Sequence, residues 1–264
     1  MKKIIYIAGY GRSGSTVLDI KIGEMVNGLS TGELGFFFRD VSKYSSSRCS
    51  CGESYYACEV WGRVFEKESF NSKVEEINRR CFMSPAFVAP YYWLKILLNG
   101  AVPSKKRLNN GTIKILDEAF LASPSGVVID SSKTAWFCYK RPLYLKKLGY
   151  EVIVVHITRP LDDVLSSVSK GDNKVLMGDR KKEKFFKILR AKVSYFFSNK
   201  KAEKLSEEVP YLKVSQIDLK NDETATLEKI NEFLKGAGLG ACDHERGGAA
   251  HLVGGNRLKY KQVK

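Results

Sequence analysis

The chain has 264 residues, and its 44 Lys and Arg against 29 Asp and Glu give a formal net charge of +15. This length suits one α/β domain with insertions better than two independent domains, so we expect a single domain over residues 1–264. No run approaches the roughly 20 apolar residues of a transmembrane helix, and the apolar run after Lys3 is too short for a signal peptide. We therefore expect a cytoplasmic protein without a transmembrane segment. The charge favours an anionic partner, although a solvated basic surface would have the same composition.

The first apolar run, residues 4–8, predicts a buried strand, and the glycine-rich run Gly9-Tyr10-Gly11-Arg12-Ser13-Gly14-Ser15-Thr16 follows it. A helix is predicted over 17–26, so backbone N–H groups at its N-terminus face any anion in the turn. The spacing matches the nucleotide-triphosphate loop G-x-x-x-x-G-K-[ST], but Ser15 stands in the position of the lysine. Arg12 supplies a charged fork suited to phosphate or sulfate, and neighbouring hydroxyls add donors. A glycine-rich turn without a ligand is the alternative.

Six cysteines occur, of which Cys49, Cys51 and Cys58 cluster, while Cys81, Cys138 and Cys242 are scattered. A closed tetrahedral zinc site needs four ligands, so C-x-C-x6-C requires Cys81 or a histidine from far away in the sequence. Metal binding and a disulfide remain open, but the sequence favours packed free thiols, and we predict no metal site.

Residues from about 40 to 110 break the alternation of strands and helices and are rich in aromatics such as Trp61, Tyr91, Tyr92 and Trp93. We interpret this part, which includes a helical pattern over 74–82, as a helical and aromatic insertion. Its aromatics either line an acceptor groove or, as is commoner at helical spacing, pack in the core.

Later apolar, β-branched runs at 127–130, 152–157 and 211–214 are typical of buried parallel strands. Helical patterns lie between and around them at 113–121, 139–148, 161–168 and 227–234. The alternation predicts a P-loop-like, three-layer α/β sandwich with a central, mainly parallel sheet. A lysine-rich tract at about 170–204 is expected to form a mobile loop followed by an amphipathic helix with a solvated outer face.

The junction Ile157-Thr158-Arg159-Pro160-Leu161 places Arg159 at the carboxyl end of a buried strand, where open α/β sheets bind ligands. Pro160 suits the first helical position, and Ser167 follows two turns later. An arginine and a serine at this spacing can share a phosphate. His156, within the strand, is expected to be a hydrogen-bonded core histidine.

Together these segments resemble the family of sulfotransferases that use 3'-phosphoadenosine 5'-phosphosulfate, PAPS. The 5'-phosphosulfate loop of that family is similar to Gly11-Arg12-Ser13-Gly14-Ser15-Thr16, and its 3'-phosphate motif is similar to Arg159 with Ser167. Further segments resemble bacterial and Golgi-type members: Cys49-Ser50-Cys51-Gly52 to Trp61, Asp130-Ser131-Ser132-Lys133, Asp218-Leu219 with 227–239, and His251 to Asn256. The resemblance implies a P-loop-like fold, PAPS as sulfuryl donor and no required metal.

The resemblance also implies roles for single residues. Glu33, in a Gly-Glu segment after the first helix, corresponds to a catalytic base, and Lys133 and Arg12 to cations at the transferred group. A glycine-rich tail from His251, with Arg257 and Lys259, is expected to close over the 3'-phosphate, although the arginine of the family stands three residues after the asparagine rather than one.

The sequence thus predicts a PAPS-dependent sulfotransferase acting on a hydroxyl, most simply of a carbohydrate or glycoconjugate that is already anionic, with no nucleic-acid partner. The alternative is a P-loop kinase or nucleotide hydrolase, in which Asp130 would be a Walker-B-like metal ligand. A third interpretation, a non-catalytic binder of RNA or acidic polymer, rests only on the charge and the interspersed aromatics.

Overall fold

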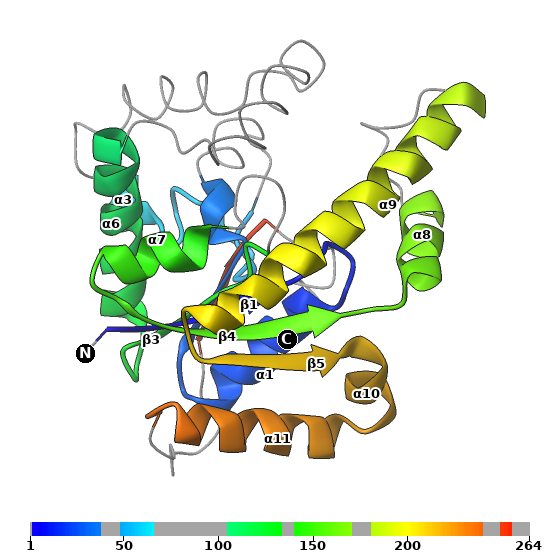
Figure 1. Cartoon of the computed structure of the whole chain (residues 1–264). Coiled ribbons are helices and arrows are strands. Elements are labelled where there is room, and N and C mark those ends of the chain that lie inside the picture. The colour runs from blue at the N-terminus through cyan, green and yellow to red at the C-terminus, as the bar shows by residue number, and fades with distance from the viewer. Residues whose placement is uncertain are drawn as a thin grey trace.

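One six-stranded sheet organises the protein (Figure 1). The computed structural model describes residues 2–37, 48–65, 105–133, 140–170, 181–239 and 249–254. The strand order is β5-β4-β1-β3-β2-β6, and every pairing between these strands is parallel. The strands are β1 (Lys3–Ala8), β2 (Leu29–Gly32), β3 (Val127–Asp130), β4 (Glu151–Thr158), β5 (Tyr211–Ser215) and β6 (Ala249–Val253).

Helices cover both faces of the sheet, which gives three layers. Alternate residues of β1 point to opposite faces, as strand geometry requires. Ile4 and Tyr6 join a core with helices α6 (Lys105–Ala122) and α7 (Arg141–Lys147), whereas Ile5 and Ile7 join a core with α1 (Ser15–Met25) and α11 (Glu223–Gly236). The remaining described helices are η1 (Leu34–Phe36), α3 (Gly62–Phe65), α8 (Leu161–Lys170), α9 (Lys181–Glu203), η3 (Lys204–Glu207) and α10 (Gln216–Asn221).

The predicted α/β sandwich is confirmed, and the sheet is parallel throughout its described strands. Two strands, β2 and β6, were not predicted. β2 contains a single large apolar residue, and β6 lies in the glycine-rich segment that was predicted to be a tail. Most of the predicted insertion, including the helix at 74–82, and residues 171–180 lie outside the described residues. Among the described helices, none is long and apolar enough to span a bilayer.

The lysine-rich tract contains the predicted helix, α9, but small residues form most of its buried stripe. Ala191, Ser194, Ser198 and Ala202 are buried at helical spacing, whereas Phe196 is 62% exposed. Trp61, in the aromatic segment predicted over residues 40–110, is fully buried. It is therefore a core residue, which is the commoner of the two interpretations of these aromatics.

The carboxyl ends of four neighbouring strands meet at one edge of the sheet. β1 leads into the glycine-rich loop, β2 into Glu33, β3 into Ser131–Lys133 and β4 into Arg159. β1 lies between β3 and β4, and the chain order reverses on the two sides of it. Ligands of open α/β sheets bind at such a switch point, and every described residue of the predicted site follows one of these four strands.

Candidate active site

The glycine-rich loop has the backbone of an anion site. Gly14 caps α1 with φ of 87°, and the N–H groups of Val17 and Leu18 both donate to its carbonyl at 3.1 Å. Gly9 has φ of 125°, and a Cβ there would lie 2.3 Å from the carbonyl oxygen of Ile157 in β4, so only glycine fits. Ser13 is 1% exposed, and among the described residues its hydroxyl has no hydrogen-bond partner. A buried, unpaired donor beside a helix N-terminus suits an anionic ligand.

The second predicted anion segment lies directly against this loop. The guanidinium of Arg159 donates from Nη1 to the carbonyl of Arg12 at 3.0 Å, and the hydroxyl of Tyr195 donates to the carbonyl of Arg159 at 2.7 Å. The buried Nε of Arg159 has no hydrogen-bond partner among the described residues, and Asp163 approaches it only to 3.9 Å. The fold therefore brings Arg12 and Arg159, two of the three arginines predicted to bind PAPS, next to each other.

Ser167 lies half-buried in α8, within the helix that begins after Arg159. Within the described part of the chain, no hydrogen bond joins Ser167 to Arg159. Arg257 and Lys259 lie outside the described residues. Their predicted contact with the 3'-phosphate thus stays a prediction, as does that of Ser167.

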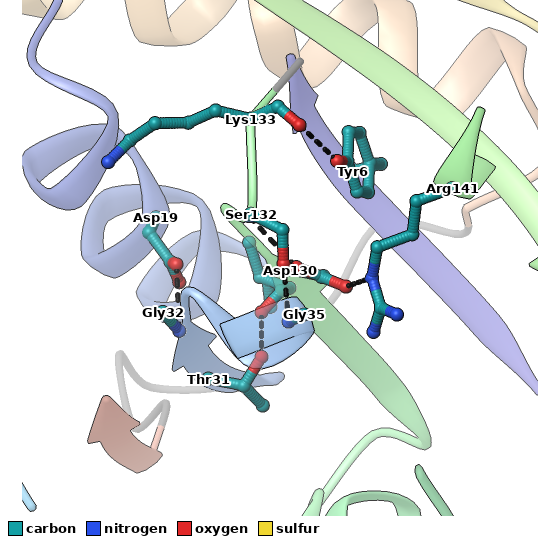
Figure 2. A network of polar contacts seen from close by, with 10 residues as sticks. Tyr6, Asp19, Thr31, Gly32, Gly35, Asp130, Ser132, Lys133 and Arg141 are labelled. Carbon is teal, nitrogen blue, oxygen red and sulfur yellow. Dashed lines mark hydrogen bonds and ion pairs between the residues drawn. The ribbon is translucent and has the colours of Figure 1, made fainter. Parts of the chain in front are cut away.

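Glu33 and Lys133, both predicted to be catalytic, form an ion pair with each other. Their side chains are only 16% and 13% exposed. The N–H of Glu33 donates to the carbonyl of Val253 in β6 at 2.7 Å, and the hydroxyl of Tyr6 in β1 donates to the carbonyl of Lys133 (Figure 2). A backbone bond to β6 holds Glu33 and a tyrosine side chain holds Lys133, so that a carboxylate and an ammonium face each other at the carboxyl edge of the sheet.

Backbone strain coincides with the two predicted cations. Arg12 has φ of 69° and Lys133 φ of 65°, and among the described residues other than glycine only Asn27 also has a positive φ. This region costs an L-residue about 1 kcal/mol or more and is rarely occupied outside turns and functional sites. Arg12 and Lys133 thus both have a strained backbone at the edge of the sheet where the site is predicted.

Asp130 is held by protein groups on both of its oxygens (Figure 2). It is fully buried, Oδ2 lies 2.7 Å from Nε of Arg141, and Oδ1 accepts from the N–H of Ser132 at 2.9 Å and from its hydroxyl. Ser132 in turn accepts from the N–H of Gly35 at 2.7 Å. A Walker-B carboxylate has to be available to a hydrated magnesium ion. Asp130 instead supports the turn that carries Lys133.

A second buried carboxyl, Asp19 in α1, lies beneath the Glu33 segment. The N–H of Gly32 donates to its Oδ2 at 3.1 Å (Figure 2). Burial raises the pKa of Asp19 to about 7, and the neighbouring charge of Asp130 adds to this rise, while polar contacts with Ser131 and Ser30 oppose it. Asp19 therefore gains a proton on folding at mildly acidic pH.

We expect Asp19→Asn to stabilise the protein progressively more as the pH rises from about 4 to about 7. The folded state holds a proton on Asp19 between pH 4 and about 7 that the unfolded chain has lost, so stability falls as the pH rises through this window. Asn does not titrate, and a shift of about three units corresponds to at most about 4 kcal/mol. Thermal melting of both proteins should show similar Tm values at pH 4 and a higher Tm for the variant at pH 8.5. An equal difference at both pH values would contradict this.

Three site residues lacked a usable sequence signal: Arg141, Tyr6 and Tyr195. Each contacts a residue from another segment that only the fold brings close, as Arg141 contacts Asp130. His156 is the core residue that was predicted, because its ring bonds to the hydroxyl of Tyr211 at 2.6 Å and to Asn199 at 2.9 Å. Burial lowers the pKa of His156, which keeps the imidazole neutral.

No family model matches the chain, and no curated protein matches it. Solved structures similar to it include the sulfotransferase domain of the Synechococcus PCC 7002 olefin synthase, with 17% identity, a TM-score of 0.48, and 93% of this chain and 78% of that chain covered. The sulfotransferase domain from the curacin biosynthetic pathway has 16% identity and a TM-score of 0.49, with 98% and 82% covered. Retinol dehydratase in complex with androsterone and inactive cofactor PAP has 16% identity and a TM-score of 0.41, with 98% and 69% covered. Because the identities are below 25% and the TM-scores below 0.5, these similarities do not establish a function for this chain. Any functional assignment has to rest on its own residues.

Proposed function

We propose that this protein is a sulfotransferase that moves a sulfuryl group from PAPS to a hydroxyl of an acceptor. The contact between the Arg159 guanidinium and the Arg12 carbonyl carries the proposal, because it joins a phosphate loop without its lysine to a second cation at the neighbouring strand. A donor with phosphate groups at both its 5' and 3' positions needs two such anion sites, whereas a nucleoside triphosphate needs one long cradle.

Each site residue then has a defined task. The loop N–H groups, Ser13, Ser15, Thr16 and Arg12 bind the 5'-phosphosulfate, and Arg159 with Ser167 binds the 3'-phosphate, to which Arg257 and Lys259 are expected to add. The donor supplies the sulfuryl group and leaves as 3',5'-adenosine bisphosphate, PAP. Such a displacement is catalysed mainly by positioning and by stabilising charge on the leaving oxygen.

Glu33 and Lys133 provide the proton transfer and the charge. The Glu33 carboxylate accepts the proton of the acceptor hydroxyl as that oxygen bonds to sulfur, and the bond from sulfur to the phosphate oxygen breaks. The ammonium of Lys133 and the guanidinium of Arg12 stabilise the negative charge that develops on the phosphate oxygen of the leaving PAP. Because Lys133 already pairs with Glu33, it orients the base before the acceptor arrives.

A carbohydrate or glycoconjugate is the acceptor class that we propose. Two points support it: the resemblance of the Gly32-Glu33 segment to tyrosine- and sugar-sulfating relatives, and the net charge of +15, which attracts an acceptor that already carries negative charge. The kinase or hydrolase alternative is less well supported, since the loop lacks its lysine and Asp130 is paired with Arg141.

Calorimetric titration with PAP and with ADP tests the donor. We expect PAP to bind at least about tenfold more tightly than ADP, because loss of one charge-assisted contact costs about 1.5–3 kcal/mol. Arg159→Ala should reduce this preference, whereas Arg63→Ala, an exposed arginine in α3, should preserve it. Equal affinities for PAP and ADP in the unaltered protein would disprove the assignment, and magnesium-dependent release of phosphate from ATP would favour the kinase or hydrolase.

A further inference from the structure

We propose that Cys49, Cys51, Cys58 and His251 bind one zinc ion as a tetrahedral structural site. Their four ligand atoms all lie within 4.8 Å of one another. Nδ1 of His251 lies 3.2 Å from Sγ of Cys58 and 3.7 Å from Sγ of Cys49. Around a tetrahedral zinc with bonds of about 2.3 Å to sulfur and 2.0 Å to nitrogen, ligand atoms are about 3.5–3.8 Å apart. The cluster therefore needs only small shifts to close around the ion.

The turn between Cys49 and Cys58 is built by its own backbone. The N–H of Gly52 donates to the carbonyl of Cys49 at 3.1 Å, and the N–H of Cys49 donates to the carbonyl of Glu53 at 2.9 Å. Gly52 has φ of 96°, which allows the chain to reverse directly after Cys51. The turn brings two thiols of this short segment to one point, and the chain then returns to add Cys58.

His251 arrives from β6, and the carboxylate of the exposed Glu59 lies beside its ring. It is 7% exposed, and its Nε2 lies 3.3 Å from Oε1 of Glu59, which leaves Nδ1 facing the thiols. Histidine ligands of metal sites commonly donate their second ring N–H to such a carboxylate, which sets the tautomer and the orientation of the ring. The carbonyl of His251 also accepts from Nε1 of Trp61 at 2.9 Å.

Serine and tyrosine contacts align the cysteine segment with β6 independently of any ion. The hydroxyl of Ser50 donates to the carbonyl of Ala250 at 2.8 Å and accepts from the N–H of Leu252 at 2.8 Å. The N–H of Gly254 donates to the hydroxyl of Tyr55 at 3.2 Å. These contacts preorganise the four ligands, so little ordering remains to oppose metal binding.

The structure supplies the ligand that the sequence lacked. Cys81 was one candidate for a fourth ligand and a distant histidine the other, and His251 follows Cys58 by 193 residues. A disulfide would use two of the three thiols and leave the third thiol and the oriented imidazole without a role. Three sulfurs and one imidazole nitrogen are the ligand set of a closed zinc site, with no open position for chemistry.

The ion would hold together the edge of the sheet formed by β2 and β6. β6 pairs with β2, and its Val253 accepts from the N–H of Glu33 at 2.7 Å. Zinc would thus fasten residues 49–58 to the strand that positions the Glu33 backbone, without touching the reacting groups. This site does not depend on the proposed donor or reaction.

Elemental analysis of the full-length chain, purified in reducing buffer after growth with zinc, tests the site. We expect about one zinc per chain, and reconstitution with Co²⁺ should give the intense visible bands of tetrahedral cobalt and a sulfur-to-metal absorption. Cys58→Ser should lose both signals, whereas Cys138→Ser, which removes a cysteine that is not one of the four proposed ligands, should retain them. Glu59→Gln should bind zinc about 10–100-fold more weakly.

If Cys58→Ser does not fold, the zinc content and the cobalt spectrum of the unaltered protein test the proposal. Well below one zinc per chain together with no tetrahedral cobalt spectrum would overturn the proposal, as would a disulfide linking two of the three cysteines in the purified chain. Unchanged zinc affinity in folded Glu59→Gln would remove the proposed role of that carboxylate in orienting His251.

Discussion

Glu33→Gln is expected to lower sulfuryl transfer from PAPS by about 10²–10⁴-fold, the usual contribution of a general base, while the Kd for PAP stays within about twofold. Gln keeps an oxygen that can accept from the ammonium of Lys133, so this largely buried lysine remains hydrogen-bonded and the fold should persist. The amide cannot accept the acceptor proton, and only the chemical step should suffer. Transfer of radioactive sulfate from PAPS to unsulfated chondroitin or heparosan would measure the rate.

Glu203→Gln is the matched control for this change. Glu203 also pairs with a lysine, Lys213, at 2.7 Å, but both side chains are about half exposed and lie outside the candidate site. Exposed pairs contribute little, so its transfer rate and Tm should match those of the unaltered protein. A folded Glu33→Gln variant with full transfer activity would show that another group takes the proton.

Four strands were predicted, and three of them, β1, β3 and β4, consist mainly of apolar residues that are buried in the sheet, whereas the fourth, β5, lies at its edge. β1, β3 and β4 lie inside the sheet with both faces covered, and their apolar β-branched runs follow from that environment. β2 is also buried, yet its Ser30 and Thr31 are accommodated by hydrogen bonds to Asp19 and Ile129 carbonyls. A strand with polar residues whose hydrogen-bond partners are set only by the fold cannot be predicted from a pattern of apolar residues.

The candidate site divides in the same way. Arg12 and Arg159 could be predicted as site residues because each follows a strand within a short motif. The pairing of Glu33 with Lys133 depends on β2 lying beside β3, a neighbour relation that no local pattern encodes. The fourth ligand of the cysteine cluster likewise depends on β6 lying beside β2. Sequence reasoning finds residues within one segment, whereas contacts between segments follow from the strand order.

Arg12→Gly is expected to weaken binding of PAP by about 10–100-fold without lowering the stability of the fold. The guanidinium makes no ion pair with a described residue, so its removal leaves no partner unsatisfied, and the loss of one charge-assisted contact to the donor costs about 1.5–3 kcal/mol. The backbone of residue 12 has φ of 69°, which glycine adopts without the cost of about 1 kcal/mol that arginine incurs. The greater freedom of glycine in the unfolded chain offsets part of that gain, so Tm should be unchanged or slightly higher.

Asn27→Gly separates the two effects. Asn27 has φ of 49° and follows the C-terminal end of α1, which is the end away from the glycine-rich loop. Glycine at position 27 therefore relieves backbone strain without removing a side chain proposed to bind PAP. Both variants should therefore melt at or near the Tm of the unaltered protein, and only Arg12→Gly should bind PAP more weakly in calorimetric titration. If Arg12→Gly binds PAP normally, the loop holds its anion with backbone N–H groups and hydroxyls alone. The strained conformation of Arg12 would then serve only to turn its carbonyl toward Arg159.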